Sequence, residues 1–220
     1  MEVLEQIAIC VENGKGNLAS PYPPSMKGQP GVDELVKQAL DGSESPDKVL
    51  DALIKGMAVI GDKFGQGKAF VPQMLLSAKA MSAGMVHLKP YFSSGEVKRK
   101  GTFIIGTVAG DLHDIGKNLV AMTVEGSGWE VIDLGVDVKP EKFVEAITQH
   151  PDSVVGLSAL LTTTMGNMEV ILKSIRAQYP NTKIIIGGAP VSQDFSNTIG
   201  ASGYSSNPQG AVELLNRLIA

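Results

Sequence analysis

Residues 107–118 read Thr107-Val-Ala-Gly-Asp-Leu-His-Asp-Ile-Gly-Lys-Asn118 and follow the apolar run Thr102-Phe-Ile-Ile-Gly106. The apolar run predicts a buried strand, and Leu119-Val-Ala-Met122 beyond the stretch predicts the start of a helix. A strand, a turn rich in glycine and acid, and then a helix form the unit at which open α/β sheets bind their ligands. The unusual residue of this turn is His113, which stands between two aspartates. What the chain does therefore depends on the residues that other segments bring to His113.

The composition indicates a soluble, globular chain and excludes some partners. Its 220 residues are enough for one large domain or two modest ones, each with a core of its own. Apolar residues make up 43% of the chain and charged residues 19%, which is typical of a folded protein rather than a disordered one. The net charge of −4 provides no basic surface, so we expect neither nucleic acid nor an anionic membrane as a main partner.

The N-terminus and the cysteine content predict a cytoplasmic protein. Met1-Glu-Val-Leu-Glu5 lacks a cationic segment followed by an apolar one, so no signal peptide is expected. No run approaches the roughly 18 apolar residues that are needed to span a bilayer. The single cysteine, Cys10, excludes an internal disulfide bond and fits a reducing cytoplasm.

The first hundred residues show helical spacing of apolar side chains and no strand signals. Helices are expected over residues 2–12, 32–40, 46–64 and 72–90. Ser45-Pro46 supplies an N-cap and a proline at the first helical position, whereas residues 14–31 are rich in proline and glycine and predict a non-helical loop. Four helices of this size fit a small antiparallel bundle, which we place at residues 1–92, with a polar linker at 93–100.

After residue 100, strand and helix signals alternate. Strands are expected at 102–108, 130–134, 153–158, 183–187 and 202–205, and helices at 117–126, 140–150, 165–179, 191–199 and 209–219. This alternation predicts a parallel sheet with helices on both faces. The fold class is therefore α/β, with a helical domain before a five-stranded, flavodoxin- or Rossmann-like sheet at residues 101–220.

The carboxyl ends of the strands form the edge at which such a sheet binds its ligand. Besides the loop with Asp111 and His113, three later loops meet there: Ser158-Ala-Leu-Leu-Thr-Thr-Thr164, Gly187-Gly-Ala-Pro190 and Tyr204-Ser-Ser-Asn207. The edge thus offers hydroxyl groups and glycines around a single imidazole, with few fixed charges. Glycines at such an edge let a ligand approach the backbone closely.

Several kinds of site do not fit this set of residues. A zinc site needs three or four protein ligands, and the remaining candidates (Cys10, His87 and His150) are predicted elsewhere. No Gly-x-Ser-x-Gly elbow is present, and Gly106-Thr-Val-Ala-Gly110 does not give the dinucleotide-binding Gly-x-Gly-x-x-Gly. A lone histidine in such a loop is often only a hydrogen-bonded turn residue. The remaining functional possibility is an imidazole that binds a metal held by a macrocycle, with Asp111 accepting its second N–H.

Family resemblance supports the macrocycle. Asp111-Leu-His-Asp-Ile-Gly116 resembles the Asp-x-His-x-x-Gly motif of cobalamin-binding domains, whose later Ser-x-Leu and Gly-Gly elements match Ser158-Ala-Leu160 and Gly187-Gly188. Asp62-Lys-Phe-Gly-Gln-Gly-Lys-Ala-Phe-Val-Pro-Gln73 is similar to the helical cap of methionine synthase and of corrinoid methyl carriers. Within this group, Thr162-Thr-Thr-Met165 and Gly187-Gly-Ala-Pro-Val-Ser-Gln-Asp-Phe195 resemble the small corrinoid proteins of methanol, methylamine and methoxyarene methyltransferase systems. The resemblance covers nearly the whole chain except residues 14–31.

The resemblance implies a B12-binding fold with cobalamin or a related corrinoid as cofactor. His113 would be the lower axial ligand of cobalt, in place of the nucleotide base of the cofactor. Asp111 would hydrogen-bond His113, and Thr164 would stand where the family often has serine in the same relay. Phe64 and Val71, the latter smaller than the leucine often found there, would cover the upper face of the corrin. The other cofactor-binding residues implied are Gly110, Leu112, Asp114, Ile115, Gly116, Ser158, Leu160, Thr162, Gly187, Gly188 and Tyr204.

The function implied is that of a methyl carrier in one-carbon metabolism, which is not catalytic by itself. Co(I) would take a methyl group to become methyl-Co(III), and would then yield it to a folate or thiol acceptor. The expected partners are a substrate-specific methyltransferase, a second methyltransferase and a reductive activator of the corrinoid. One alternative is a cobalamin-dependent sensor, although the short acidic N-terminal segment provides no DNA-binding helix-turn-helix. Another is the small subunit of an adenosylcobalamin mutase, although such subunits generally lack the helical cap.

Overall fold

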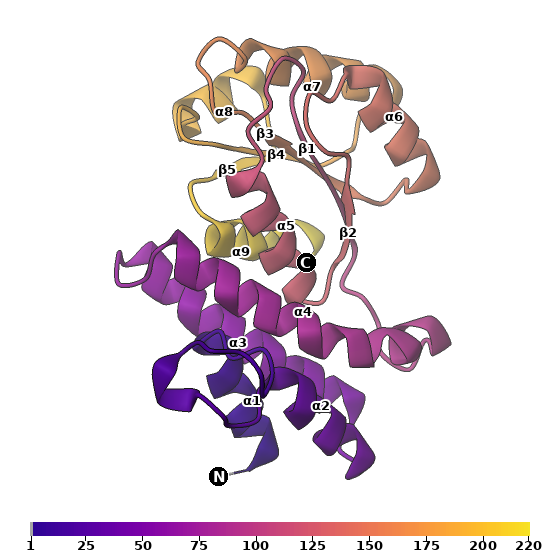
Figure 1. Ribbon diagram of the computed structural model, residues 1–220. Coiled ribbons are helices and arrows are strands. Elements are labelled where there is room, and N and C mark those ends of the chain that lie inside the picture. Colours follow the sequence, from indigo (N-terminus) through magenta and orange to yellow (C-terminus); the bar gives the residue numbers. More distant parts are fainter. Residues whose placement is uncertain (1) are drawn as a thin grey trace. The chain divides into compact units, whose positions relative to one another are not determined.

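The computed structural model describes residues 2–220, which divide into two compact units. The first unit runs to Arg99 and includes Gly126–Gly128, and the second comprises Lys100–Glu125 and Trp129–Ala220. Figure 1 shows the first unit as helices and the second as a sheet covered by helices. None of the described helices combines the length and the apolar character needed to cross a membrane.

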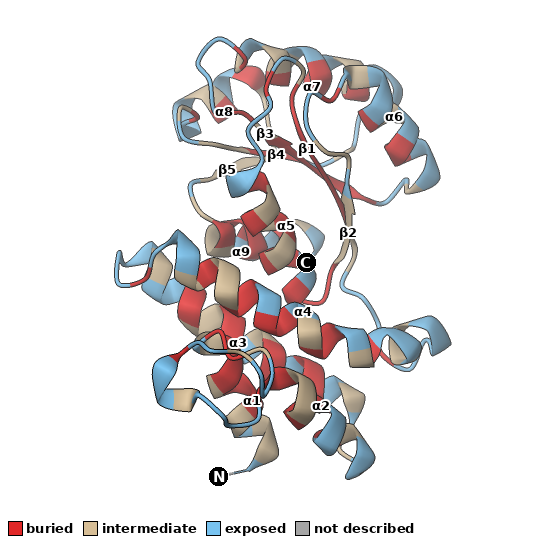
Figure 2. Cartoon of the chain, viewed as in Figure 1, coloured by how far each residue is buried: buried red, intermediate tan, exposed pale blue. Residues whose placement is uncertain are grey.

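Four α-helices form the first unit, as the sequence predicted. They are α1 (Val3–Glu12), α2 (Val32–Asp41), α3 (Pro46–Gly65) and α4 (Val71–Ser94). Side chains spaced at three and four residues, such as Leu53 and Met57 of α3, are buried in the core of this unit (Figure 2). Met74, Met81 and Met85 of α4 are buried with them, so the methionines of this helix pack into the core of the unit.

The end predicted for α4 at Pro90 was wrong, because the helix continues through Pro90 to Ser94. A proline inside a helix lacks the N–H that would bond to the carbonyl four residues earlier, here that of Val86. Val86 and Pro90 both lie on the exposed side of α4, where water can satisfy the carbonyl. Helix α4 therefore occupies the first two residues of the segment that we expected to be a linker. It ends at Gly95, whose φ of +78° is left-handed.

Residues 14–31 are an ordered loop that contains one helical turn, where the sequence predicted none. The turn is the 3₁₀ helix η1 (Pro24–Met26), and proline is tolerated there because its missing N–H would have no helical partner. The Glu34 carboxylate accepts hydrogen bonds from the backbone N–H groups of Leu18 (2.9 Å) and Gly31 (2.8 Å). At the start of α3, Ser45 occupies the predicted N-cap position, but its side chain makes no capping hydrogen bond.

The second unit is the predicted five-stranded parallel sheet. Its strands are β1 (Thr102–Thr107), β2 (Glu130–Asp133), β3 (Val154–Ser158), β4 (Ile184–Gly187) and β5 (Gly203–Ser205), in the order β2-β1-β3-β4-β5. Its helices are α5 (Ile115–Gly126), α6 (Pro140–Gln149), α7 (Gly166–Gln178), α8 (Gln193–Ile199) and α9 (Pro208–Ile219). Chain order reverses between the neighbouring strands β1 and β3, which makes the gap beyond their carboxyl ends the switch point of the sheet.

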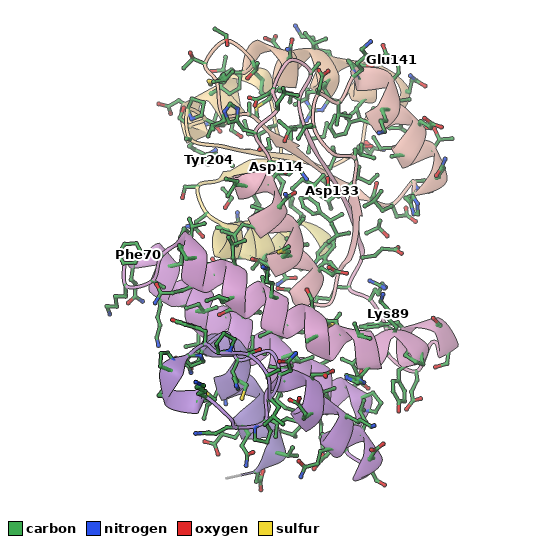
Figure 3. The ribbon with its side chains drawn as sticks, viewed as in Figure 1. Phe70, Lys89, Asp114, Asp133, Glu141 and Tyr204 are labelled. Atoms are coloured by element: carbon green, nitrogen blue, oxygen red, sulfur yellow. The ribbon has the colours of Figure 1, made fainter. Side chains whose placement is uncertain are left out.

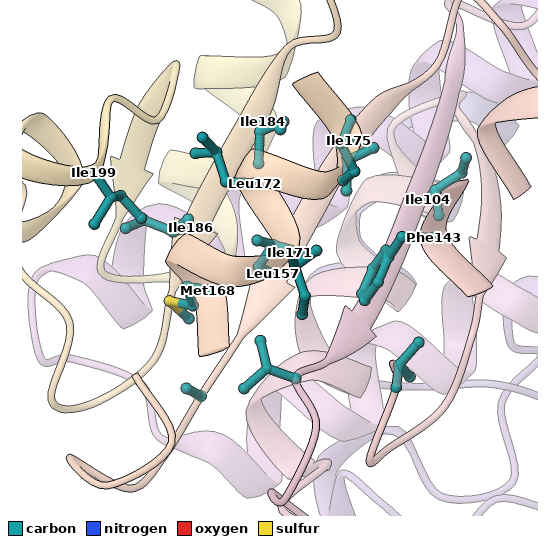
Figure 4. Packing of buried hydrophobic residues seen from close by; sticks show 14 of the residues in the cluster. Ile104, Phe143, Leu157, Met168, Ile171, Leu172, Ile175, Ile184, Ile186 and Ile199 are labelled. Atoms are coloured by element: carbon teal, nitrogen blue, oxygen red, sulfur yellow. The ribbon is translucent and has the colours of Figure 1, made fainter. Parts of the chain in front are cut away.

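Each face of the sheet has its own apolar core. Ile104 of β1 packs with side chains of α6, α7 and α8, including Phe143 and Ile171, on one face (Figure 4). Phe103 and Ile105 point to the other face, where they pack with side chains of α5 and α9. Burying a side chain of this size stabilises the fold by about 1.5–3 kcal/mol. The two cores fix β1 and β3 rigidly, and thereby fix the starting points of the loops beyond them.

Candidate functional site

The loop after β1 and the loop after β3 meet at the switch point. The first carries Asp111 and His113, and the second carries Leu160, Leu161 and Thr164. The two loops are joined by the Asp111 carboxylate, which is fully buried. Its Oδ1 accepts hydrogen bonds from the backbone N–H of His113 (3.1 Å) and contacts His113 Nδ1 (2.8 Å). Its Oδ2 accepts from Leu160 N (2.8 Å), Leu161 N (3.3 Å) and Thr164 Oγ1 (2.7 Å).

These contacts decide the protonation of the pair. Burial alone would raise the pKa of Asp111, but hydrogen bonds from the backbone N–H of Leu160, the Thr164 hydroxyl and His113 outweigh it. The pKa of Asp111 therefore lies well below its usual range, and the carboxylate is charged. A charged carboxylate only accepts hydrogen bonds, so the proton between the two side chains is on His113 Nδ1. Whenever this imidazole carries a single proton, its lone pair is therefore on Nε2.

His113 presents that nitrogen outward. Its side chain is 49% exposed, and Nε2 makes no hydrogen bond to any residue in 2–220. The Thr107 hydroxyl, which is buried, donates to the His113 carbonyl (2.9 Å) and fixes the backbone below the ring. An imidazole oriented by a carboxylate through one nitrogen, with the other nitrogen free, is the usual arrangement of a metal-binding histidine.

One such nitrogen does not make a metal site by itself. Within the described part of the chain, no group of three or more His, Cys, Asp or Glu side chains could hold a metal ion. A metal bound by His113 must therefore bring its other ligands with it, as a metal in a macrocycle does. The surroundings suit such a group, because four exposed leucine and isoleucine side chains lie on these two loops. They are Leu112, Ile115, Leu160 and Leu161.

Two glycines of the predicted site have quite different surroundings. Gly188, directly after β4, has a φ of +128°, and a Cβ there would lie 1.8 Å from the carbonyl oxygen of Ala159. Only glycine can therefore let the loops after β3 and β4 approach so closely. At Gly116, on the first turn of α5, a Cβ would meet no atom within 4 Å. The space beside Gly116 is thus open to a ligand, which fits the proposed cofactor.

The other residues predicted for this edge lie as follows. Gly110, with a φ of +80°, begins the turn that leads to Asp111. Gly187 ends β4, and a Cβ there would lie 3.0 Å from the carbonyl oxygen of Ser205. Asp114 precedes α5, where its carboxylate accepts from Asn118 Nδ2 (3.0 Å), and Tyr204 of β5 is half-buried against the core (Figure 3).

The loop after β3 holds the remaining predicted residues. The Ser158 carbonyl accepts from Val108 N (3.0 Å), which ties the end of β3 to the segment after β1. Thr162 is exposed. The Thr164 hydroxyl bonds to Asp111, so this threonine does not serve α7 as a side-chain cap.

Phe64 and Val71, predicted to cover the cofactor, belong to the helical unit. Phe64 is half-buried near the end of α3, and Val71 is exposed at the first position of α4. Between them, Phe70 is 68% exposed and projects from the turn (Figure 3). The Phe70 backbone N–H donates to the Gln73 side chain (2.8 Å), which fixes the start of α4. Sequence reasoning did not single out Phe70, although it stands inside the motif quoted for the helical cap.

Three further residues hold the loop after β1 and were not predicted. Asn167 Nδ2 donates to the carbonyl of Ala109 (2.7 Å), and the Asp137 carboxylate accepts from Gly110 N (2.7 Å). Leu161 contributes both an exposed side chain and a backbone N–H to Asp111. None of them forms a pattern with His113 along the chain, so only the folded structure brings them together.

Comparison with known proteins shows the family to which the chain belongs. Residues 101–212 match the family of B12 binding domains, and residues 29–89 match a second family described as B12 binding domain. A corrinoid protein of Desulfitobacterium hafniense is 38% identical over 86% of this chain and 90% of its own length. A dimethylamine corrinoid protein of Methanosarcina acetivorans is 38% identical over 85% and 88%. A chain of the methanol:cobalamin methyltransferase complex of Methanosarcina barkeri is similar over 99% of this chain and 79% of that one, with a TM-score of 0.76 and 28% identity.

Proposed function

This chain belongs to the B12-binding corrinoid proteins of methyltransferase systems, and we propose that it carries a methyl group between two methyltransferases. Its cofactor is of the cobalamin type. When bound, the corrinoid supplies a cobalt ion that accepts a methyl group from a donor and releases it to an acceptor. The chain's own residues bind, orient and shield that cofactor.

The observation that carries the proposal is the pairing of Asp111 with His113. The charged carboxylate holds the proton on His113 Nδ1 and leaves Nε2 as the free donor atom. We propose that Nε2 would bind the cobalt of the corrinoid. Thr164 donates to the far oxygen of the same carboxylate, so the hydroxyl, the carboxylate and the imidazole form one chain of hydrogen bonds. A shift of the Nδ1 proton toward Asp111 strengthens the imidazole as a ligand, which lets the protein follow a change at the metal.

The roles proposed for the remaining residues come from the family resemblance. Leu112, Ile115, Leu160 and Leu161 provide apolar contacts for the rim of the macrocycle. Gly110, Asp114, Gly116, Ser158, Thr162, Gly187, Gly188 and Tyr204 are proposed to accommodate the rest of the cofactor. Phe64 and Val71 are proposed to cover the reacting side, and a cover of this kind must move when an enzyme docks.

The named relatives point to the donor side. One is a dimethylamine corrinoid protein, and another belongs to a methanol:cobalamin methyltransferase complex. We therefore propose that a separate methyltransferase, specific for a small methylated compound, loads this protein. A second methyltransferase would pass the methyl group to a folate or a thiol, and a reductive activator would restore the cofactor.

The first test is the coordination of the cobalt. His113→Ala, loaded with cobalamin, should lose the absorption spectrum of histidine-ligated cobalt. His150→Ala is the matched control, because His150 follows α6 and is remote from the switch point. An unchanged spectrum in His113→Ala would refute the ligand assignment.

The second test is the transfer itself. The reduced protein should be methylated by a purified methyltransferase in the presence of that enzyme's own substrate, such as methanol or a methylamine. It should then lose the methyl group to a folate or a thiol when a second methyltransferase is added. Both steps are followed by the absorption spectrum of the cofactor and by mass spectrometry of the product. Failure of every methyltransferase of this class to methylate the protein would exclude a carrier role.

A further inference from the structure

The end of β1 remains paired with the segment beyond β2 after β2 itself has ended. Thr107 N donates to the Gly135 carbonyl (3.0 Å), and Val138 N donates to the Thr107 carbonyl (2.9 Å). Val108 and Val138 form an isolated parallel bridge one residue further on. The loop that carries His113 therefore has a second neighbour, the segment 135–138, on the side opposite to β3.

Asp137 of that segment makes two hydrogen bonds to the loop of His113. Its Oδ1 accepts from the backbone N–H of Gly110 (2.7 Å), and its own backbone N–H donates to the carbonyl of Asp111 (3.0 Å). Asp137 thus holds two successive residues of the loop, Gly110 through its side chain and Asp111 through its backbone. A bond from an N–H to a charged carboxylate is stronger than one to a neutral carbonyl.

The backbone of Asp137 is unusual as well. Its φ is +51°, and Ser43 is the other non-glycine residue in 2–220 with a positive φ. Ser43 lies just beyond the end of α2, where a left-handed residue commonly closes a helix. Asp137 closes no helix. A left-handed side-chain residue persists where its surroundings fix it, and such residues collect at functional sites.

We propose that Asp137 is a positioning residue that holds the Gly110–Asp111 backbone so that His113 can bind the cobalt of the cofactor. On the β3 side, the same loop is held through the Asp111 carboxylate by Leu160 and Thr164. Those bonds fix a side chain, whereas Asp137 fixes the main chain from which Asp111 and His113 both extend. Without the Asp137 side chain, the Asp111 carboxylate keeps its hydrogen bonds from Leu160 and Thr164. The backbone that sets the distance between the imidazole and the cofactor, however, loses the hydrogen bond from Gly110 N.

This inference rests on the proposed role of His113 as a cobalt ligand, and its test separates the two. Asp137→Gly keeps the left-handed backbone and removes the carboxylate. Asp137→Asn keeps both an acceptor oxygen and the tolerance for a positive φ. Asp152→Gly is the control, because Asp152 is an exposed aspartate before β3, at the opposite edge of the sheet. His113→Ala is measured in parallel.

The first readout uses the protein without cofactor. Amide hydrogen exchange at Gly110 should be accelerated about tenfold or more in Asp137→Gly, whereas the exchange of core amides in β1 should be unchanged. The second uses the protein loaded with cobalamin. Asp137→Gly should bind cobalamin roughly tenfold more weakly and show a smaller fraction of histidine-ligated cobalt, as is usual for residues that orient a metal ligand. Asp137→Asn should restore most of both values, and Asp152→Gly should match the unsubstituted protein.

The outcomes distinguish the two proposals. If His113→Ala loses the histidine-ligated spectrum while Asp137→Gly keeps both the spectrum and the affinity, Asp137 is not a positioning residue. The same conclusion follows if Asp137→Asn is as impaired as Asp137→Gly, because the acceptor oxygen would then be irrelevant. If His113→Ala keeps the spectrum, the ligand assignment itself fails, and the role of Asp137 fails with it.

Discussion

The loop after β1 and the turn between α3 and α4 both expose apolar side chains, and the family resemblance assigns both to the cofactor. They differ in how they are held. In the first, the Asp111 carboxylate, Asp137, Asn167 and Thr107 each make a hydrogen bond that fixes the path of the chain. In the second, Phe70 is exposed. Within residues 2–220, its backbone N–H donates to one side chain, that of Gln73 in the first turn of α4.

The difference fits the two roles proposed for these segments, a metal ligand and a cover. A metal ligand must stay at one place, and buried charge-assisted hydrogen bonds provide that precision because breaking any of them is costly. A cover must be able to leave, and an exposed apolar side chain can do so without breaking a polar bond. Substitutions of the buried groups that fix the loops of the sheet unit should therefore have large effects on stability. Exposed residues of the helical turn should have small ones.

The largest effect is expected for Gly188→Ala. The added Cβ would lie 1.8 Å from the Ala159 carbonyl oxygen, at a φ of +128° that alanine does not tolerate. The loops after β3 and β4 would have to separate, so we expect a loss of about 4 kcal/mol or more in the free energy of unfolding. Urea unfolding followed by circular dichroism measures it.

Gly116→Ala is the control for Gly188→Ala, because it adds the same methyl group at a glycine that has open space beside it. A Cβ at Gly116 meets nothing within 4 Å, and alanine favours a helix by about 1 kcal/mol over glycine. This variant should be as stable as the unsubstituted protein or more so, yet should bind cobalamin more weakly because the methyl group enters the open space. Equal stability of the two alanine variants would show that the close approach at Gly188 is not required.

The second effect is that of Asp111→Asn. An amide cannot accept from all the groups that now donate to the buried carboxylate, and its NH₂ would face donors. We expect a loss of about 3 kcal/mol at pH 7, measured by urea unfolding, with weakened binding of cobalamin. Thr164→Val, which removes one donor and leaves the charge, should lose less. A fully stable Asp111→Asn variant would contradict the geometry of the site.

The same carboxylate gives a pH dependence with a defined sign. The pKa of Asp111 is lower in the folded protein than in the unfolded chain, where it is about 3.9. The stabilisation is therefore complete above that value and is lost as the pH falls below about 4. Unfolding measured at pH 6 and pH 3 should show a smaller decrease for Asp111→Asn than for the unsubstituted protein. An equal decrease would show that another carboxylate is responsible.

The sequence was sufficient for the elements of the sheet unit but not for the bonds between its loops. Continuous apolar runs predicted β1, β3 and β4 to within one residue, because burial on both faces leaves a local pattern. The Asp-x-His-x-x-Gly motif placed Asp111 and His113 in one loop, because both belong to one segment. Asp137 was missed, because its bonds depend on the pairing of β1 with β2. The end of α4 was wrongly predicted at Pro90 for a related reason. Whether a proline ends a helix depends on whether the carbonyl that it leaves unbonded, here that of Val86, can reach water.

A smaller effect is expected at Cys10 of the helical unit. Burial raises the pKa of the Cys10 thiol to about 11, with Lys15 opposing and Glu34 adding to the shift. In the unfolded chain the thiol ionises near pH 8.5, so the neutral buried thiol stabilises fully below that pH and less as the pH rises toward 11. Between pH 8 and pH 10, the unsubstituted protein should lose about 2 kcal/mol more than Cys10→Ala.

Two measurements check this. Urea unfolding at both pH values gives the difference directly. A thiol reagent at pH 8 should react slowly with the native protein and rapidly in urea, because the thiol is buried and protonated. Rapid reaction of the native protein would mean that the N-terminal helix opens readily, and would weaken the view that the helical unit has a rigid core.

The smallest effect on stability is expected for Phe70→Ser, in the turn between α3 and α4. Because Phe70 is 68% exposed, its loss should change the free energy of unfolding by less than about 0.5 kcal/mol. Leu53→Ala, in the buried core of the same unit, should lose about 2–5 kcal/mol, which shows that the assay can detect a packing defect. If the turn covers the cofactor, Phe70→Ser should nevertheless increase the rate at which air oxidises the reduced cofactor, followed by absorption. If Phe70→Ser changes neither the free energy of unfolding nor the rate of oxidation, Phe70 is not part of the cover, and Phe64 and Val71 remain its candidates. If Phe70→Ser is strongly destabilised, the turn is held by packing and is not free to move.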